Sequence, residues 1–283
     1  MSGLNRRDFL RASALAVGTI VVSSGLQGCL SSSSSDDAAR ELSFNHGVAS
    51  GDPLADRVII WTRVTPLDGR SADISVGWEI ATDAAFTDLV HSGTATTGAA
   101  RDYTLKVDAQ NLLPGTTYYY RFKAADVISP VGRMKTLPAG SIDQVRFAVM
   151  SCSNYPAGYF HVYAAAAAES ELDAVIHLGD YIYEYGNGGY ATEDAAALGR
   201  LLPDNNAGEI LTLTDYRRRY ALYRTDTDLQ SLHAAAPFIA VWDDHEVAND
   251  TWRDGAENHN EGEGDFTARK LAALQAYFEW MPV

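Results

Sequence analysis

The period of the hydrophobic pattern changes near residue 140, and this change constrains the possible fold more than any other feature of the sequence. Before that point, short β-branched and aromatic runs follow one another at about ten-residue spacing. Turn sequences separate the runs, as in Pro-Leu-Asp-Gly at 66–69 and Pro-Gly at 114–115. This arrangement predicts an antiparallel β-sandwich over residues 41–138. The predicted strands cover residues 57–64, 74–80, 89–96, 103–107, 117–123 and 131–136.

One segment indicates which kind of sandwich to expect. Residues 112–118 read Leu-Leu-Pro-Gly-Thr-Thr-Tyr and resemble the tyrosine corner of immunoglobulin-like and fibronectin type III sandwiches. In that corner the tyrosine hydroxyl bonds to nearby backbone, so we expect Tyr118 to be structural. Acidic and histidine residues are scattered through this region, and we assign it a structural role rather than a chemical one.

From residue 143 onward, predicted strands and helices alternate. A short hinge with Pro138 and Gly140 precedes this region. The order strand, helix, strand, two helices, strand predicts a parallel sheet with helices on its faces. The predicted strands are 145–151, 173–178 and 238–242, and the predicted helices are 159–169, 215–223 and 226–235.

Polar side chains follow each of the three predicted strands. Because the carboxyl ends of neighbouring parallel strands meet at one edge of a sheet, we expect these side chains to lie close together. Carboxylate, phenolate and thiolate ligands together suit trivalent iron, and additional carboxylates suit calcium or manganese. In chain order the side chains are Cys152 and Asn154, then Asp180 and Tyr183, then Asp243, Asp244 and His245.

Several motifs resemble those of one enzyme family. Gly-Asp-Tyr-Ile-Tyr at 179–183 and Asp-Asp-His-Glu at 243–246 are similar to metallophosphoesterase motifs. The segment 46–53, His-Gly-Val-Ala-Ser-Gly-Asp-Pro, is similar to the opening of the β-sandwich in PhoD-type alkaline phosphatases. The resemblance implies an α/β metallophosphoesterase-like domain over 143–283, preceded by an immunoglobulin/fibronectin III-like sandwich.

The resemblance also implies metal ligands. Cys152 would bind iron, Asp180 would bridge two metal ions, and Tyr183 would bind iron through its phenolate. Asp244 occupies the position of the superfamily's metal-binding asparagine. The family implies iron and calcium, while the residues alone are also compatible with zinc or manganese.

A reaction follows from the same resemblance. His245 occupies the position of the histidine that stabilises or protonates the departing alkoxide. Asn154 and Asp243 are weaker candidates for the site. The implied reaction is hydrolysis of phosphate monoesters or diesters by a metal-activated water. A serine-based mechanism has no support, because the sequence contains no Gly-x-Ser-x-Gly motif.

The first 40 residues predict export. Arg6 and Arg7 precede a short apolar run at 12–22, which resembles a twin-arginine signal, although a basic surface helix is the alternative. Cys29 ends a lipobox-like segment, so we expect a lipoprotein signal over 1–29 and a flexible tether over 30–40. The expected location is periplasmic or at the cell surface, with the twin-arginine machinery and the membrane as partners. If Cys29 carries lipid, Cys152 has no disulfide partner, and it is either a ligand or an inert thiol.

The net charge and the last predicted helix indicate which partners to expect and whether the second domain is complete. A net charge of −15 argues against nucleic-acid binding, and we expect a monomer. The helix that ends the sequence has an apolar face that needs a packing partner, and three strands make a thin sheet. The apolar face of this helix comprises Leu271, Leu274, Tyr277 and Phe278. We therefore expect a phosphatase domain incomplete at its C-terminus.

The alternative function is a non-catalytic, lipid-anchored cell-surface binding protein.

Overall fold

The computed structural model of the chain describes residues 40–283. The signal predicted over 1–29, with Arg6, Arg7 and Cys29, lies outside the described residues, as does all of the predicted tether except Arg40. No helix within residues 40–283 is long and apolar enough to cross a lipid bilayer.

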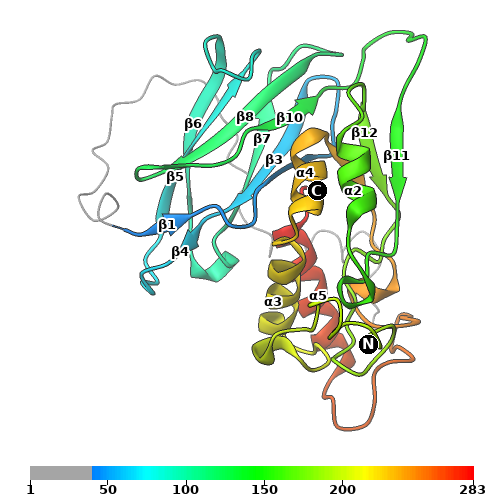
Figure 1. The fold of residues 1–283 in the computed structure, drawn as a ribbon. Coiled ribbons are helices and arrows are strands. Elements are labelled where there is room, and N and C mark those ends of the chain that lie inside the picture. The colour runs from blue at the N-terminus through cyan, green and yellow to red at the C-terminus, as the bar shows by residue number, and fades with distance from the viewer. Residues whose placement is uncertain (1–39) are drawn as a thin grey trace, which may run out of the picture.

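An antiparallel sheet in the order β10-β8-β5-β6, with β9 beside β8, forms one layer of the N-terminal region (Figure 1). Alternate side chains of β8 are buried, because successive residues of a strand point to opposite faces. The Tyr118 hydroxyl accepts a hydrogen bond from the Leu113 backbone N–H at 2.9 Å, which confirms the predicted tyrosine corner. The strands are β5 (Ile74–Ala81), β6 (Leu89–Thr97), β8 (Thr117–Ala124), β9 (Val127–Ile128) and β10 (Gly132–Lys135).

The second layer belongs to a six-stranded sheet in the order β11-β12-β13-β2-β3-β7. Its antiparallel part packs on the first layer around one apolar core, to which Ile60 and Val107 contribute from one side and Trp78 and Phe122 from the other. Its other three strands are parallel, as the alternation of strands and helices predicts. The strands are β2 (Val48–Gly51), β3 (Arg57–Arg63), β7 (Thr104–Gln110), β11 (Phe147–Met150), β12 (Ala174–His177) and β13 (Phe238–Ala240).

The sandwich and the α/β region are thus joined by strand pairing as well as by the linker near residue 140. Phe238 of β13 pairs with Gly51 of β2 in parallel, and Asp52 N–H donates to the Phe238 carbonyl at 2.9 Å. A Cβ atom at Gly51 would overlap the carbonyl oxygens of Phe238 and Pro282, so only glycine fits. The segment 46–53 therefore has a structural position at the joint between the two regions.

Within residues 40–283, four α-helices accompany the parallel strands, and side-chain caps define where three of them begin. Thr212 and Asp215 form a capping box at α3, while Asp226 caps α4 and Asp265 caps α5. The helices are α2 (His161–Ala167), α3 (Leu213–Tyr223), α4 (Thr227–Ala235) and α5 (Phe266–Trp280). Short 3-10 helices are η1 (Ala99–Arg101), η2 (Tyr155–Ala157), η3 (Asp204–Asn206) and η4 (Asp244–Glu246), and β1 (Leu42–Ser43) pairs with β4 (Thr65–Pro66).

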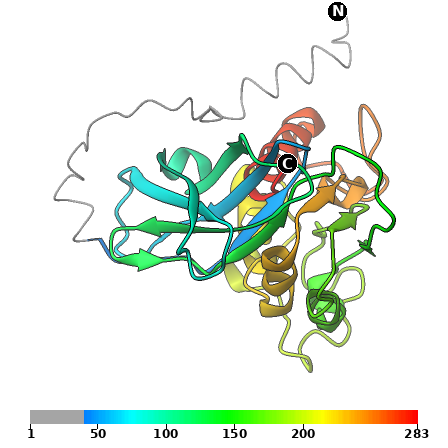
Figure 2. The same ribbon diagram turned by 90° about the horizontal axis from the view of Figure 1, so that it is seen from above.

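Helices α2 and α4 lie side by side over one face of the parallel strands (Figures 1 and 2). On this face the Tyr163 hydroxyl contacts His177, which is buried in the sheet. On the opposite face, Val149, Ile176 and Ile239 are paired across the three strands, and Val149 and Ile239 are exposed. The parallel part of the sheet is therefore covered on one side only within residues 40–283.

Helix α5 finds its packing partner inside the molecule. It contacts α3, and the Trp61 indole N–H of β3 donates to the Glu279 carbonyl at 2.8 Å. Of the apolar face expected from the sequence, Leu274 and Tyr277 are buried, whereas Leu271 is half-exposed. The helix therefore ties the α/β region to the sandwich sheet.

Candidate active site

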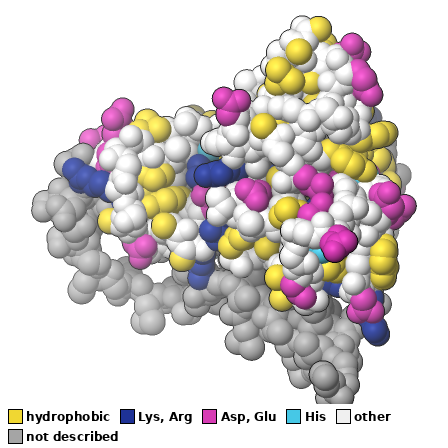
Figure 3. Space-filling model, turned by 90° about the horizontal axis from the view of Figure 1, so that it is seen from below, with side chains coloured by type: hydrophobic (Ala, Val, Ile, Leu, Met, Phe, Trp, Pro, Cys, Tyr) yellow, Lys and Arg dark blue, Asp and Glu magenta, His cyan; other side chains and the backbone are white. Residues whose placement is uncertain are grey.

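Three loops meet at the carboxyl ends of β11, β12 and β13, as their parallel order predicts. The Cys152 N–H donates to the Gly179 carbonyl at 3.2 Å, and the Ser153 N–H donates to the Asp180 carbonyl at 2.8 Å. These bonds fix the first loop against the second. Figure 3 views the molecule from this end and shows acidic side chains and a histidine on the surface.

The backbone of these loops takes unusual conformations where it carries the polar side chains. Cys152 and Asp180 have φ angles of 60° and 53°, in the left-handed region that costs non-glycine residues about 1–2 kcal/mol each. Gly179 has a φ of 105°, and a Cβ atom there would overlap the Asp243 backbone. The close approach of the second and third loops therefore requires glycine at 179, and strain of this kind is common at functional sites.

Asp180 lies at the centre of the cluster. Its Oδ2 atom accepts hydrogen bonds from the Cys152 thiol at 3.3 Å and from the Tyr183 hydroxyl at 3.2 Å. Its Oδ1 atom is buried and has no hydrogen-bond partner among the described residues. A buried carboxylate oxygen without a donor is costly, and a cation would compensate for it. The donor set of Cys152, Asp180 and Tyr183 therefore fits a metal ion.

A second group shares Asp180. One potential ligand atom from each of Asp180, Asp244 and His245 lies within 4.8 Å of the other two. Asp244 is held by the backbone N–H of Asp250, which donates to its Oδ2 atom. Both groups contain Asp180, the residue for which the family resemblance implies a bridging role.

His245 is oriented by Glu184, a residue that the sequence analysis did not select. The His245 Nδ1 atom lies 2.8 Å from Glu184 Oε2. An ionised carboxylate only accepts hydrogen bonds, so Nδ1 carries the proton and Nε2 is left for chemistry. The Tyr183 ring stacks on the imidazole with centroids 4.2 Å apart. Glu184 directly follows Tyr183 in the chain, but nothing in the sequence pattern distinguishes it from a surface glutamate.

The charges around His245 determine its protonation. Burial alone would lower the pKa of His245, but the hydrogen bond and the negative charge of Glu184, together with Asp180 and Asp244, raise it overall. Burial would raise the pKa of Glu184, but bonds from His245, Asn258 and the Asn249 N–H lower it, which keeps this carboxylate ionised. The buried carboxylate of Glu184 therefore favours the protonated form of His245.

Tyr183 is a neutral phenol in the absence of a cation. Burial raises its pKa strongly, and the negative charge of Asp180 raises it further. A cation bound to Asp180 would act in the opposite direction, because positive charge favours the phenolate.

Glu246 is a second residue that the sequence analysis missed. It accepts hydrogen bonds from the backbone N–H groups of Asp180 at 3.0 Å, Asp243 at 2.7 Å and Tyr181. Burial raises its pKa to about 8, although these three donors oppose the shift. Glu246 thus connects the second loop to the third by hydrogen bonds. Its place in the Asp-Asp-His-Glu motif was the feature of the sequence that could have identified it.

The weaker candidates lie at the margin of the cluster. The Asn154 amide donates to the Tyr190 carbonyl at 3.3 Å, and the Asp243 side chain is exposed.

Two arginines of α3 have structural partners: Arg219 donates to carbonyls of the second loop, and Arg217 pairs with Glu279. The residues that the structure brings together are Cys152, Asp180, Tyr183, Asp244 and His245.

Known proteins share this arrangement of sequence and fold. The chain matches the PhoD-like phosphatase family over residues 147–283 and the N-terminal domain of PhoD-like phosphatases over residues 29–138. It is 43% identical over 247 residues to alkaline phosphatase D of Bacillus subtilis (strain 168), a match that covers 85% of this chain and 41% of that protein. A solved structure of PhoD matches with a TM-score of 0.77 and 42% identity, over 85% of this chain and 46% of the other.

The chain therefore spans less than half the length of each of these two relatives. Within the matched length, the agreement extends through both the sandwich and the α/β region. The two family matches leave only residues 1–28 and 139–146 outside them. The chain belongs to the PhoD-like phosphatase family.

Proposed function

We propose that this chain carries the metal-binding and acid-base residues of an exported phosphatase that hydrolyses phosphate monoesters or diesters. The observation that supports this most is the buried Oδ1 atom of Asp180, a residue shared by both ligand groups, because this atom has no hydrogen-bond partner among residues 40–283. Because the chain spans less than half of its relatives, the activity is proposed for the whole protein to which this site belongs.

The donor chemistry suggests how cations are divided between the two groups. Cys152 and Tyr183 offer a thiolate and a phenolate and would hold iron, with Asp180 as the shared ligand. Asp244 adds a carboxylate oxygen that suits calcium, and zinc or manganese are also compatible with it. When bound, such cations neutralise phosphate oxygens and make a bound water more acidic. They would also offset the net charge of −15, which otherwise repels an anionic ester.

His245 is the general acid in this proposal. Glu184 holds the proton of Nδ1, so the ring presents Nε2 to the departing group. The raised pKa favours the protonated ring, whose Nε2–H donates its proton to the leaving oxygen. The Tyr183 ring against the imidazole restricts its rotation.

We also propose the location and partners that the N-terminal sequence predicts. Arg6 and Arg7 before an apolar run support export by the twin-arginine machinery, and Cys29 supports a lipid anchor. The acidic surface supports a protein that acts on small phosphate esters rather than on a nucleic-acid scaffold.

Visible absorbance tests the metal assignment. The full chain, loaded with iron and calcium, is expected to show a phenolate-to-iron band that disappears in Tyr183→Phe and changes in Cys152→Ala. Tyr185→Phe is the matched control: Tyr185 also lies near His245, with ring centroids 5.7 Å apart, and should keep the band. Identical spectra in all variants would reject Tyr183 as a ligand. A folded, colourless protein without phosphatase activity would favour a non-catalytic role.

A further inference from the structure

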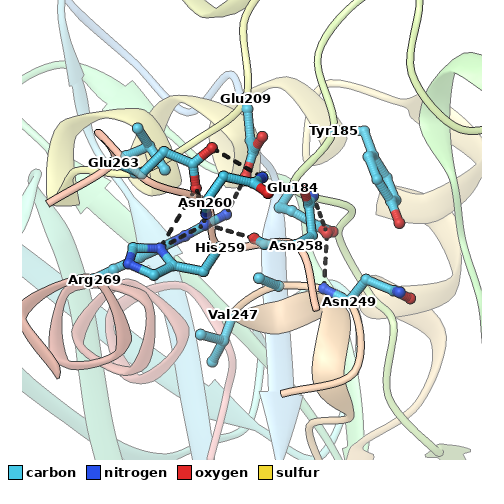
Figure 4. Close-up of polar contacts among 12 residues, drawn as sticks. Glu184, Tyr185, Glu209, Val247, Asn249, Asn258, His259, Asn260, Glu263 and Arg269 are labelled. Atoms are coloured by element: carbon cyan, nitrogen blue, oxygen red, sulfur yellow. Dashed lines mark hydrogen bonds and ion pairs between the residues drawn. The ribbon is translucent and has the colours of Figure 1, made fainter. Parts of the chain in front are cut away.

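The loop at 249–265 supplies most of the hydrogen bonds that hold Glu184 (Figure 4). Glu184 is fully buried and accepts three bonds at 2.8 Å each. His245 Nδ1 binds its Oε2 atom, while the Asn249 backbone N–H and the Asn258 side-chain amide both bind Oε1. The carboxylate is therefore held on one oxygen by the loop and on the other by the imidazole.

Asn258 is itself fixed in place by helix α5. Its backbone carbonyl accepts a hydrogen bond at 2.8 Å from Nη1 of Arg269, whose side chain is buried. The same guanidinium donates to Glu209 at 2.7 Å and to the Tyr216 hydroxyl at 3.1 Å. Figure 4 shows Asn258, Glu209 and Arg269, with Arg269 on the side away from Tyr185. Arg269 thus ties the backbone of Asn258 to helix α5.

The division of bonds on Glu184 has a consequence for His245. A buried carboxylate is stable in one orientation only while its donors are present, because each unmet acceptor is costly there. With both loop donors on Oε1, Oε2 remains directed at Nδ1. Without Asn258, Oε1 retains a single backbone donor, and the carboxylate is free to turn away from the ring.

We propose that Asn258 is a positioning residue that acts through Glu184 to keep His245 in one orientation and one tautomer. This inference rests on the proposed phosphatase function only in assigning a catalytic task to His245. Partners of this kind, one step removed from the reacting groups, typically change activity by about 10–100-fold when removed.

The same loop offers a matched control. Asn260 lies two residues further on, and its backbone N–H and side-chain amide bind Glu263 rather than Glu184. Asn258→Ala should lower kcat for p-nitrophenyl phosphate about 10-fold with little change in KM, whereas Asn260→Ala should leave kcat within about twofold. Asn258→Asp, which places a second carboxylate against Glu184, should have a larger effect than Asn260→Asp. Thermal unfolding of each variant shows whether it is folded.

The ¹⁵N signals of His245, recorded at a pH high enough for the imidazole to be neutral, supply a readout that does not depend on turnover. The unaltered chain and Asn260→Ala should show one tautomer with the proton on Nδ1, and Asn258→Ala should show a mixture. If the chain has no activity but the tautomer responds in this way, the positioning role stands and the phosphatase proposal fails. Equal kcat and an unchanged tautomer in folded Asn258→Ala and Asn258→Asp would overturn the inference.

Discussion

Tyr118 of the sandwich and Tyr183 at the edge of the parallel sheet are both buried, but their hydroxyl groups have different partners. In the sandwich, Tyr118 accepts a bond from the Leu113 N–H, so its hydroxyl closes a turn within one segment. At the sheet edge, Tyr183 donates to Asp180, which also accepts from Cys152 on another loop. The Tyr118 hydroxyl thus satisfies a backbone N–H of its own turn, whereas the group around Tyr183 includes an oxygen of Asp180 that has no donor among residues 40–283. The first hydroxyl closes a structural motif, and the second belongs to a group of potential ligand atoms.

Backbone strain follows the same division. In the sandwich, Asn111 and Ala125 have positive φ angles in turns between strands, where the chain reverses. At the sheet edge, the residues with positive φ angles include Cys152 and Asp180, which carry the donor atoms. In the turns the strained residues let the chain change direction, and at the site they direct side chains toward one point.

The largest difference in phosphatase activity should appear when one aspartate in each region is replaced by asparagine. Asp180→Asn removes the charge shared by both ligand groups and is expected to abolish hydrolysis while leaving the fold largely intact. Asp83 is the control, because its carboxylate accepts only local backbone N–H groups in a sandwich turn. Asp83→Asn should retain full activity. Turnover of p-nitrophenyl phosphate and thermal unfolding measure both effects, and retained turnover in Asp180→Asn would reject the metal assignment.

The two regions also differ in how much of them the sequence could predict. The sandwich strands and Tyr118 follow from local alternation and turn residues, and the three ligand loops follow from the order of strands and helices. The pairing of Gly51 with Phe238 could not be predicted, because it joins residues far apart in sequence. The same reason applies to Glu184, whose partner His245 lies 61 residues away, and to the bond from the Asp180 N–H to Glu246, which spans 66 residues.

A smaller effect is expected from neutralising one carboxylate in each region. Glu184→Gln removes the charge beside His245 and should lower kcat about 10–100-fold. Glu79 in β5, which pairs with Arg121 at 2.7 Å and with Lys123, is the control, and Glu79→Gln should leave kcat unchanged. Equal kcat values in the two variants would show that Glu184 has only a structural role.

The pH dependence of Glu184→Gln sharpens this test. The charge of Glu184 raises the pKa of His245, so the ring stays protonated to a higher pH than it otherwise would. A general acid must be protonated to act, and activity therefore falls as pH rises through this pKa. In Glu184→Gln the pKa falls, and the loss of activity should begin at a lower pH than in the unaltered chain. A pH–rate profile with its basic limb unmoved would contradict the assignment of His245 as the acid.

The smallest effect should come from the tyrosine that closes the sandwich turn. Tyr118→Phe keeps the buried ring but leaves the Leu113 N–H without its acceptor, which should lower the free energy of unfolding by about 1 kcal/mol. Water can reach this turn, since Leu113 is largely exposed, so the loss should not be larger. Urea unfolding measures it, and kcat should not change. Tyr183→Phe should give the opposite result, with lost iron absorbance and little change in stability. Both variants must behave this way if the hydroxyl of Tyr118 serves the fold and that of Tyr183 serves the ligand.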